Sequence, residues 1–100
     1  MLLEFEGEAI EWRGPAPFIF VPIPLDLSAE IKAISNQVTY GWGVIPVHAK
    51  IGNTAYSTSL FPKGGVYLVP IKLVVQKAEG VKVGDTVSIQ LEVVSGSKRY

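Results

Sequence analysis

The sequence predicts a mostly β protein: a small closed or nearly closed barrel of six to seven strands with two short helices. Three observations lead to this fold class. Apolar and polar residues alternate along several short segments, turn residues separate those segments, and only two segments repeat apolar residues at helical spacing. Hydrophobic residues make up 48% of the chain, and a barrel removes the exposed strand edges that so apolar a chain could not tolerate.

Size, charge and cysteine content exclude several classes of protein. One hundred residues accommodate one domain, which we expect to occupy residues 1–100. Nine basic and nine acidic residues cancel, so no overall field attracts nucleic acid or an anionic membrane. The chain contains no cysteine, which excludes a disulfide scaffold, thiolate chemistry and cysteine-based metal sites.

The first residues do not resemble a secretory signal, because acidic residues recur at every second position after Leu3. The longest apolar stretch, residues 18–25, contains two prolines and is far shorter than the roughly 20 residues that span a bilayer. We therefore expect a cytoplasmic protein with no membrane partner.

The first strand alternates from Leu3 to Ala9, with glutamates on its other face. The alternation shifts by one residue near Ala9, after which Ile10 and Trp12 are the apolar positions. A β-bulge there would bend the strand into a barrel. After a turn, residues 18–21 are apolar on both faces, so we expect them to be buried on both faces or to lie at an interface. The prolines that follow end this strand.

A short helix is expected over residues 29–35. Ser28 precedes it and has the side chain of an N-cap. The apolar stripe that would face the core consists of Leu27, Ile31 and Ile34.

A hairpin is expected around the two-residue turn Gly52–Asn53. Its first strand comes from residues 38–51, which are interrupted by glycines at 41 and 43. The turn sets the register of the two strands. On one face it pairs Ile51 with Thr54, Ala49 with Tyr56, Val47 with Thr58 and Ile45 with Leu60; on the other it pairs Lys50 with Ala55, His48 with Ser57 and Pro46 with Ser59.

The remaining elements follow in order. A turn at 62–65 precedes a short strand at 66–69. A second helix is expected to begin at Pro70, since the first turn needs no N–H there, and to end at Gly80. A turn over 81–85 leads into the last strand. Its alternating apolar positions are Val87, Ile89, Leu91 and Val93.

His48 is the single histidine of the chain, and the predicted register places it beside Ser57. One hypothesis is a hydrolase with Ser57 as nucleophile and His48 as base. Such catalysis also requires a carboxylate that orients the imidazole and donors for an oxyanion, and no carboxylate is near in sequence. A solvent-facing histidine beside a serine is the simpler interpretation, so we assign no catalytic residue.

No metal and no cofactor are expected. One histidine without cysteine leaves only carboxylates as further ligands, and no acidic calcium loop or Glu-x-x-His pair occurs. Lys63 and the two glycines after it could form a weak anion site from one ammonium and backbone N–H groups. A plain hairpin turn also accounts for these residues.

Tyr40 and Trp42 are the leading candidates for a ligand site. Trp42 lies between two glycines, which permit mobility and close approach, and an aromatic ring there suits stacking on a ligand or partner. We expect both aromatics to line one end of the barrel with His48, Ser57 and Ser59. In the alternative interpretation, Trp42 closes that end as a cap.

Several motifs follow one another in a characteristic order. They are Gly14–Pro15, residues 18–22, Gly43–Val44–Ile45–Pro46–Val47, Gly52, Ser59–Leu60–Phe61–Pro62, Tyr67–Leu68–Val69–Pro70–Ile71, Lys77–Ala78–Glu79–Gly80 and Gly84–Asp85–Thr86–Val87. Together they resemble the DUF1905 family of domains of unknown function. The resemblance implies a small barrel of bacteria and archaea, fused in some members to a domain associated with bacteriocin protection and outer-membrane proteins. It implies no established activity, cofactor or catalytic residue.

A more distant resemblance concerns the second half. Leu68–Val69–Pro70, a short helix, and then residues 83–89 are similar to transition-state regulators with swapped-hairpin barrels, which bind DNA as dimers. By this resemblance the DNA-binding candidates are Lys63, Lys72, Lys77 and Lys82. The zero net charge argues against nucleic acid, and a strand, a helix and a Gly-Asp turn also form a generic barrel unit.

The sequence therefore favours a non-catalytic binding module that receives a small ligand or a protein segment. Its alternatives are a dimeric nucleic-acid-binding barrel and a hydrolase that uses His48 and Ser57. The doubly apolar strand at 18–21 also suggests a homodimer.

Overall fold

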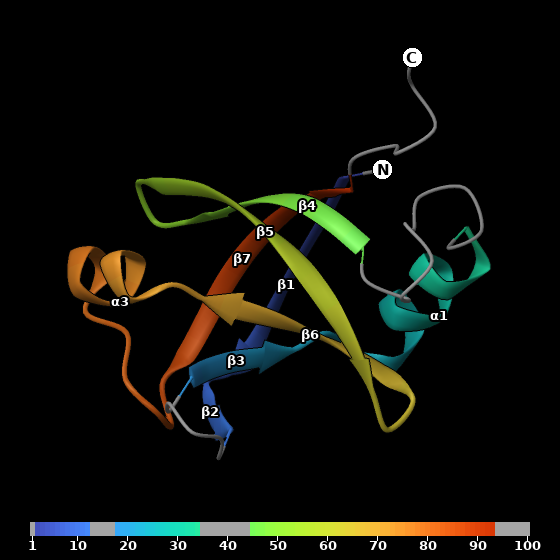
Figure 1. Cartoon of the computed structure of the whole chain (residues 1–100), viewed down its shortest axis with the longest axis horizontal. Helices are drawn as coiled ribbons and strands as arrows, with labels where there is room; N and C mark the ends of the chain where they lie inside the picture. The colour runs from blue at the N-terminus through green and yellow to red at the C-terminus, as the bar shows by residue number, and fades with distance from the viewer. Residues whose placement is uncertain (1, 13–17, 35–44, 94–100) are drawn as a thin grey trace.

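The computed structural model describes residues 2–12, 18–34 and 45–93 (Figure 1). The strands in these ranges are β1 (Leu2–Glu8), β2 (Ile10–Trp12), β3 (Phe18–Pro22), β4 (Ile45–Ile51), β5 (Thr54–Lys63), β6 (Val66–Ile71) and β7 (Thr86–Val93). The helices are α1 (Leu25–Ala33) and α3 (Leu73–Glu79). The expected mostly β architecture with two short helices is confirmed.

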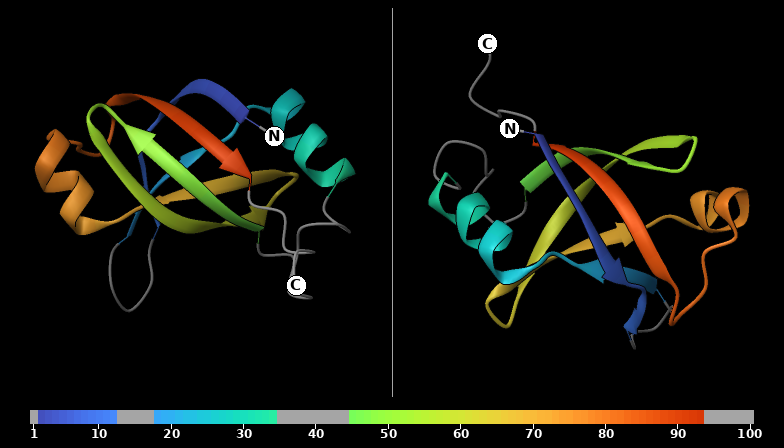
Figure 2. Two further views of the ribbon diagram at one scale, coloured as in Figure 1. Left: turned by 90° about the horizontal axis from the view of Figure 1, so that it is seen from above. Right: turned by 180° about the vertical axis from the view of Figure 1, so that it is seen from behind.

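The strands form one sheet in the order β1-β7-β4-β5-β6-β3-β2, and each neighbouring pair is antiparallel. The sheet curls strongly into a half-barrel but remains open (Figure 2). The fully closed barrel among our expectations is therefore wrong, because β1 and β2 form the two ends of the sheet. These two end strands are consecutive in the chain, and Ala9 alone separates them.

Ala9 makes the corner between β1 and β2, at the position where the alternation shifts. Its N–H donates to the Asp85 carbonyl and its own carbonyl accepts from the Gly84 N–H, both at 2.8 Å. Before the corner the chain pairs with β7, and after it Ile10 lies opposite Phe20 of β3. The predicted shift of alternation at Ala9 is confirmed, but in place of the expected β-bulge the strand breaks and the chain moves from one end of the sheet to the other.

Helix α1 begins at Leu25, so the prediction of an N-cap at Ser28 is wrong. Pro24 occupies the N-cap position with φ −52° and ψ 152°. Asp26 lies in the first turn, where its negative charge interacts favourably with the helix dipole. Ser28 is instead inside the helix and buried. Its hydroxyl donates to the Ile23 carbonyl at 3.0 Å and accepts from the Tyr67 N–H at 3.1 Å.

Helix α3 begins at Leu73, three residues later than predicted. Pro70 belongs to β6, where it lies opposite Phe20 of β3, so it does not begin a helix. The predicted end is confirmed, because Gly80 adopts a left-handed conformation with φ 65° that suits glycine. The two helices lie at opposite ends of the molecule (Figures 1 and 2).

The register predicted for the hairpin of β4 and β5 is confirmed at all seven pairs. One face of β4 therefore points into the core, with Ile45, Val47, Ala49 and Ile51 buried. Ile31 of α1 and Val75 of α3 are fully buried in the same core cluster. In the described ranges, no helix has the length and apolar character needed to cross a membrane.

Candidate functional site

The predicted ligand site is only partly visible. Tyr40 and Trp42 lie outside the described residues. His48, Ser57 and Ser59 lie on the outer face of the β4–β5 hairpin, since their alternating neighbours are turned to the core. His48 is exposed, and a hydrogen bond of 3.0 Å joins its Nδ1 to the Ser57 Oγ.

The structure adds a carboxylate that sequence reasoning missed. Glu92 of β7 lies directly opposite His48 across the β4–β7 pair, so Ser57, His48 and Glu92 form a row over three strands. Sequence distance concealed this neighbour, because β7 joins β4 only through tertiary pairing. In a serine hydrolase triad the serine contacts Nε2 and the acid contacts Nδ1. Here Ser57 contacts Nδ1, which is the geometry of a surface hydrogen bond.

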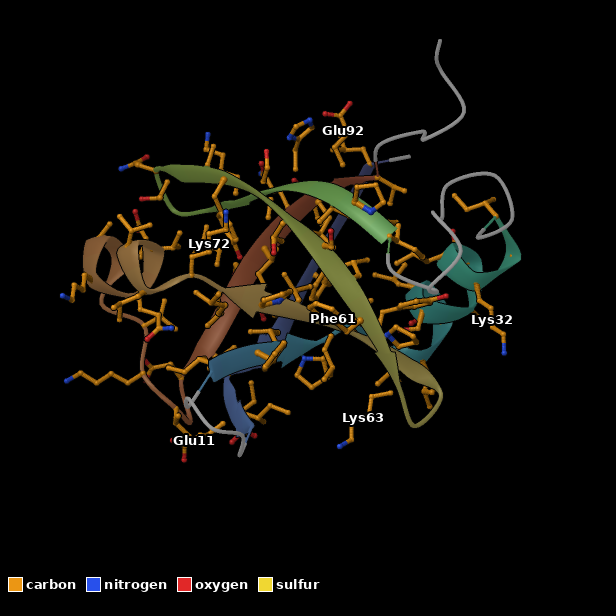
Figure 3. The ribbon with its side chains drawn as sticks, in the orientation of Figure 1. Glu11, Lys32, Phe61, Lys63, Lys72 and Glu92 are labelled. Atoms are coloured by element: carbon orange, nitrogen blue, oxygen red, sulfur yellow. The ribbon has the colours of Figure 1, made fainter. Side chains whose placement is uncertain are left out.

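The four candidate DNA-binding lysines are divided between two places. Lys72, Lys77 and Lys82 come from α3 and the residues that flank it. Lys63 ends β5, at the other end of β6, and six residues of extended chain span about 20 Å. Figure 3 shows Lys63 and Lys72 at well-separated positions.

The predicted turn at 62–65 is confirmed in position. Gly64 and Gly65 both have positive φ, 59° and 89°, as a two-residue turn of type I′ requires. Lys63 and the two glycines border a hollow of about 390 Å³ that α1 also lines, with Lys32 among its residues.

A larger hollow lies on the outer face of the other half of the sheet. We call it the apolar groove; its volume is about 590 Å³, and the described residues that line it are Phe20, Thr58, Phe61, Pro70, Ile71, Lys72, Leu73 and Gln76. Figure 3 labels Phe61 beside β5 and Lys72 on the side of α3. Strands β3, β5 and β6 supply its floor, and the start of α3 supplies one wall.

The floor of the apolar groove follows from strand alternation. Val69 and Ile71 are buried in the core, so the residue between them, Pro70, faces outward. Phe20 lies opposite Pro70, and its ring meets that of Phe61 edge to face, with centroids 6.4 Å apart and planes at 77°. Such a contact is favourable beyond the burial of area alone.

Hydrogen bonds hold this floor and wall in place. From the core side, the Tyr56 hydroxyl donates to the Pro70 carbonyl at 2.9 Å. Burial raises the pKa of Tyr56 above its ordinary value of 10.0, so the phenol keeps its proton, and with it this donor, at a pH where an exposed tyrosine would ionise. From the wall, Gln76 Nε2 donates to the Ile71 carbonyl at 2.7 Å.

Sequence reasoning did not identify the apolar groove, although one signal pointed toward it. Residues 18–21 are apolar on both faces, and Phe20 is the outward-facing member that lines the groove. The contribution of α3 could not be foreseen, because it depends on that helix beginning after Lys72 instead of at Pro70.

Metal binding receives no support from the described ranges, in which no three His, Cys, Asp or Glu residues are grouped to hold an ion. Glu79, the carboxylate nearest the β4–β5 turn, is engaged by protein donors. Its Oε2 accepts from the Thr54 hydroxyl at 2.6 Å and from the Asn53 N–H at 3.3 Å.

The family model described as Domain of unknown function (DUF1905) matches residues 5–91 of the chain. No curated protein matches the chain.

Proposed function

Because the chain belongs to the DUF1905 family, which carries no assigned activity, we propose its function from its own surface. The protein is a non-catalytic binding module, and it receives a small, largely apolar ligand in the apolar groove. This site replaces the barrel end around His48 as the leading candidate.

The observation that carries this proposal is an apolar concavity of ligand size. Its volume of about 590 Å³ falls in the range of small-molecule sites, roughly 300–1,000 Å³. Phe61 and Leu73 on its lining remain 43% and 63% exposed. Covering such side chains is favourable, at about 25 cal/mol per Å² of apolar surface removed from water.

The supporting strands make the apolar groove a preformed site. Phe20 and Pro70 belong to paired strands, and Phe61 lies opposite Leu68 in the β5–β6 pair. A ligand that enters therefore orders few side chains and loses little affinity to conformational entropy.

The polar groups of the lining suit binding better than catalysis. They are one hydroxyl from Thr58, one amide from Gln76 that is already engaged with Ile71, and one ammonium from Lys72. General acid–base or nucleophilic chemistry needs a second titratable group within hydrogen-bond reach. The described lining residues supply no such pair.

The proposal is tested by NMR titration of the labelled protein with a panel of small apolar compounds. We expect shift changes at Phe20, Phe61, Ile71 and Leu73. Replacing Phe61→Ala should weaken binding about tenfold, because the ring covers the ligand and supports Phe20.

The matched control is Val83→Ala. Val83 is 54% exposed in the turn after α3 and does not line the apolar groove, so its loss should leave affinity unchanged. The proposal is wrong if no compound binds, or if the shift changes gather around His48 and Ser57 instead. Equal loss of affinity in both variants would also contradict it.

A further inference from the structure

We infer that the ligand of the apolar groove is an amphiphilic monocarboxylate, with its apolar tail on Phe20, Phe61 and Pro70 and its carboxylate at the Lys72 ammonium. This inference rests on the proposed function and names the chemical class that the site selects.

Among the described residues that line the apolar groove, Lys72 is the single charged one. The other seven described lining residues bring no carboxylate that would neutralise it. Its side chain is exposed, so the ammonium stands at the rim while the floor is apolar. A ligand that is apolar along its length and anionic at one end matches this division of the lining.

The backbone holds Lys72 firmly at that rim. It occupies the N-cap position of α3 with φ −63° and ψ 150°, and its carbonyl accepts from the N–H groups of Val75 and Gln76, each at 2.9 Å. The lysine ammonium is a compact charge on a flexible stem, which suits one carboxylate whose position varies with tail length.

Charge also argues against a second copy of the chain as the occupant. In a two-fold dimer through the apolar groove, the same surface would meet itself. The described lining holds no carboxylate, so neither Lys72 would meet an opposite charge on the other copy's groove. A small anion instead places an opposite charge beside each ammonium.

The test compares three ligands that share one tail and differ at the head: octanoate, 1-octanol and octylamine, each titrated by NMR at neutral pH. We expect octanoate to bind about three- to fivefold more tightly than the alcohol, as exposed ion pairs typically allow, and octylamine to bind most weakly. The preference for octanoate should shrink with added salt.

Two variants and one control assign this preference to Lys72. Lys72→Gln should make octanoate and 1-octanol bind equally, because the carboxylate no longer meets a positive charge. Lys72→Glu should reverse the order of octanoate and octylamine. Lys77→Gln removes an exposed charge from the same helix, outside the lining, and should preserve the wild-type order.

The outcomes separate the two proposals. If none of the three ligands binds, the proposed function itself fails. If all three bind equally, or if Lys72→Gln keeps the preference for octanoate, the carboxylate class is wrong while the binding function stands. If light scattering shows a dimer that octanoate dissociates, a second copy occupies the groove, and the monocarboxylate assignment is overturned.

Discussion

At the scale of single residues, Ser28 shows how one hydroxyl joins three elements. Within α1 its side chain is only 1% exposed, yet it bonds to the carbonyl of Ile23 after β3 and to the N–H of Tyr67 in β6. Ile23 and Tyr67 also pair directly, through an N–H to carbonyl bond of 2.9 Å. A buried polar side chain is tolerated here because both of its hydrogen bonds are made.

Replacing Ser28→Ala should lower the free energy of unfolding by about 1–3 kcal/mol. The reason is that a buried carbonyl and a buried N–H would each lose a partner without access to water. Urea unfolding measures the loss. Ser57→Ala, which removes an exposed hydroxyl, is the control and should cost less than about 0.5 kcal/mol. Equal stability of the two variants would show that Ser28 does not hold α1 to the sheet.

At the scale of elements, the hydrogen bond from Tyr56 of β5 to Pro70 of β6 crosses a part of the sheet that strand pairing does not cover. The described β5–β6 pairs run from Phe61 to Lys63, whereas Tyr56 lies five residues before them. Its hydroxyl therefore connects the long hairpin strand to the strand under the apolar groove.

The burial of the Tyr56 hydroxyl predicts that the stability of the fold depends on pH. Burial raises the pKa of Tyr56 in the folded protein above its ordinary value of 10.0. Below pH 10 both states are protonated and the contribution is constant. As pH rises above about 10, the unfolded chain releases a proton that the folded chain retains, so stability falls.

The measurement is urea unfolding of the wild type and of Tyr56→Phe between about pH 8 and pH 11. Near neutral pH the variant should be less stable by about 1 kcal/mol, because the Pro70 carbonyl loses its donor. Its decline above pH 10 should be shallower than that of the wild type. Part of the decline should remain, since burial also raises the pKa of Tyr67. An identical decline in both proteins would contradict the assignment to Tyr56.

At the scale of the whole molecule, the open sheet depends on a close approach between β1, at one end, and β3, the strand next to the other end. A Cβ added to Gly7 of β1 would lie 2.6 Å from Val21 Cγ1 and 3.0 Å from the Pro22 carbonyl oxygen of β3. Glycine thus lets β1 rest directly on β3 beside the Ala9 corner. Helix α1 packs Ile31 into the same core.

Replacing Gly7→Ala should therefore destabilise the fold by about 1–3 kcal/mol, because the added methyl group meets β3 and forces β1 and β3 apart. Thermal and urea unfolding measure the loss. Combining it with Val21→Ala should give less than the sum of the two losses, since the smaller side chain makes room.

Gly64→Asn provides the control for this substitution. Gly64 has no atom within 4 Å of an added Cβ, and asparagine tolerates its φ of 59°. This variant should stay close to wild-type stability. If Gly7→Ala were equally harmless, the contact between β1 and β3 would not support the fold.

The sequence by itself determined the local features whose causes lie within a few residues. The Gly52–Asn53 turn and the alternation around it predicted the register of β4 and β5, and the shifted alternation at Ala9 predicted the corner. Gly80 predicted the end of α3 because few residues other than glycine adopt its left-handed conformation easily. The motif series likewise predicted the family.

Only the tertiary structure decided which distant segments became neighbours. The predicted starts of both helices were wrong. Ser28 is hydrogen-bonded to Tyr67 of β6, and Pro70 is paired with Phe20 of β3, and local capping preferences do not include those partners. In the same way, Glu92 reached His48 only through the β4–β7 pairing. The apolar groove exists because the curled sheet brings Phe20, Phe61 and Leu73 together from three elements. Such long-range contacts follow from packing of the whole core, which no single segment encodes.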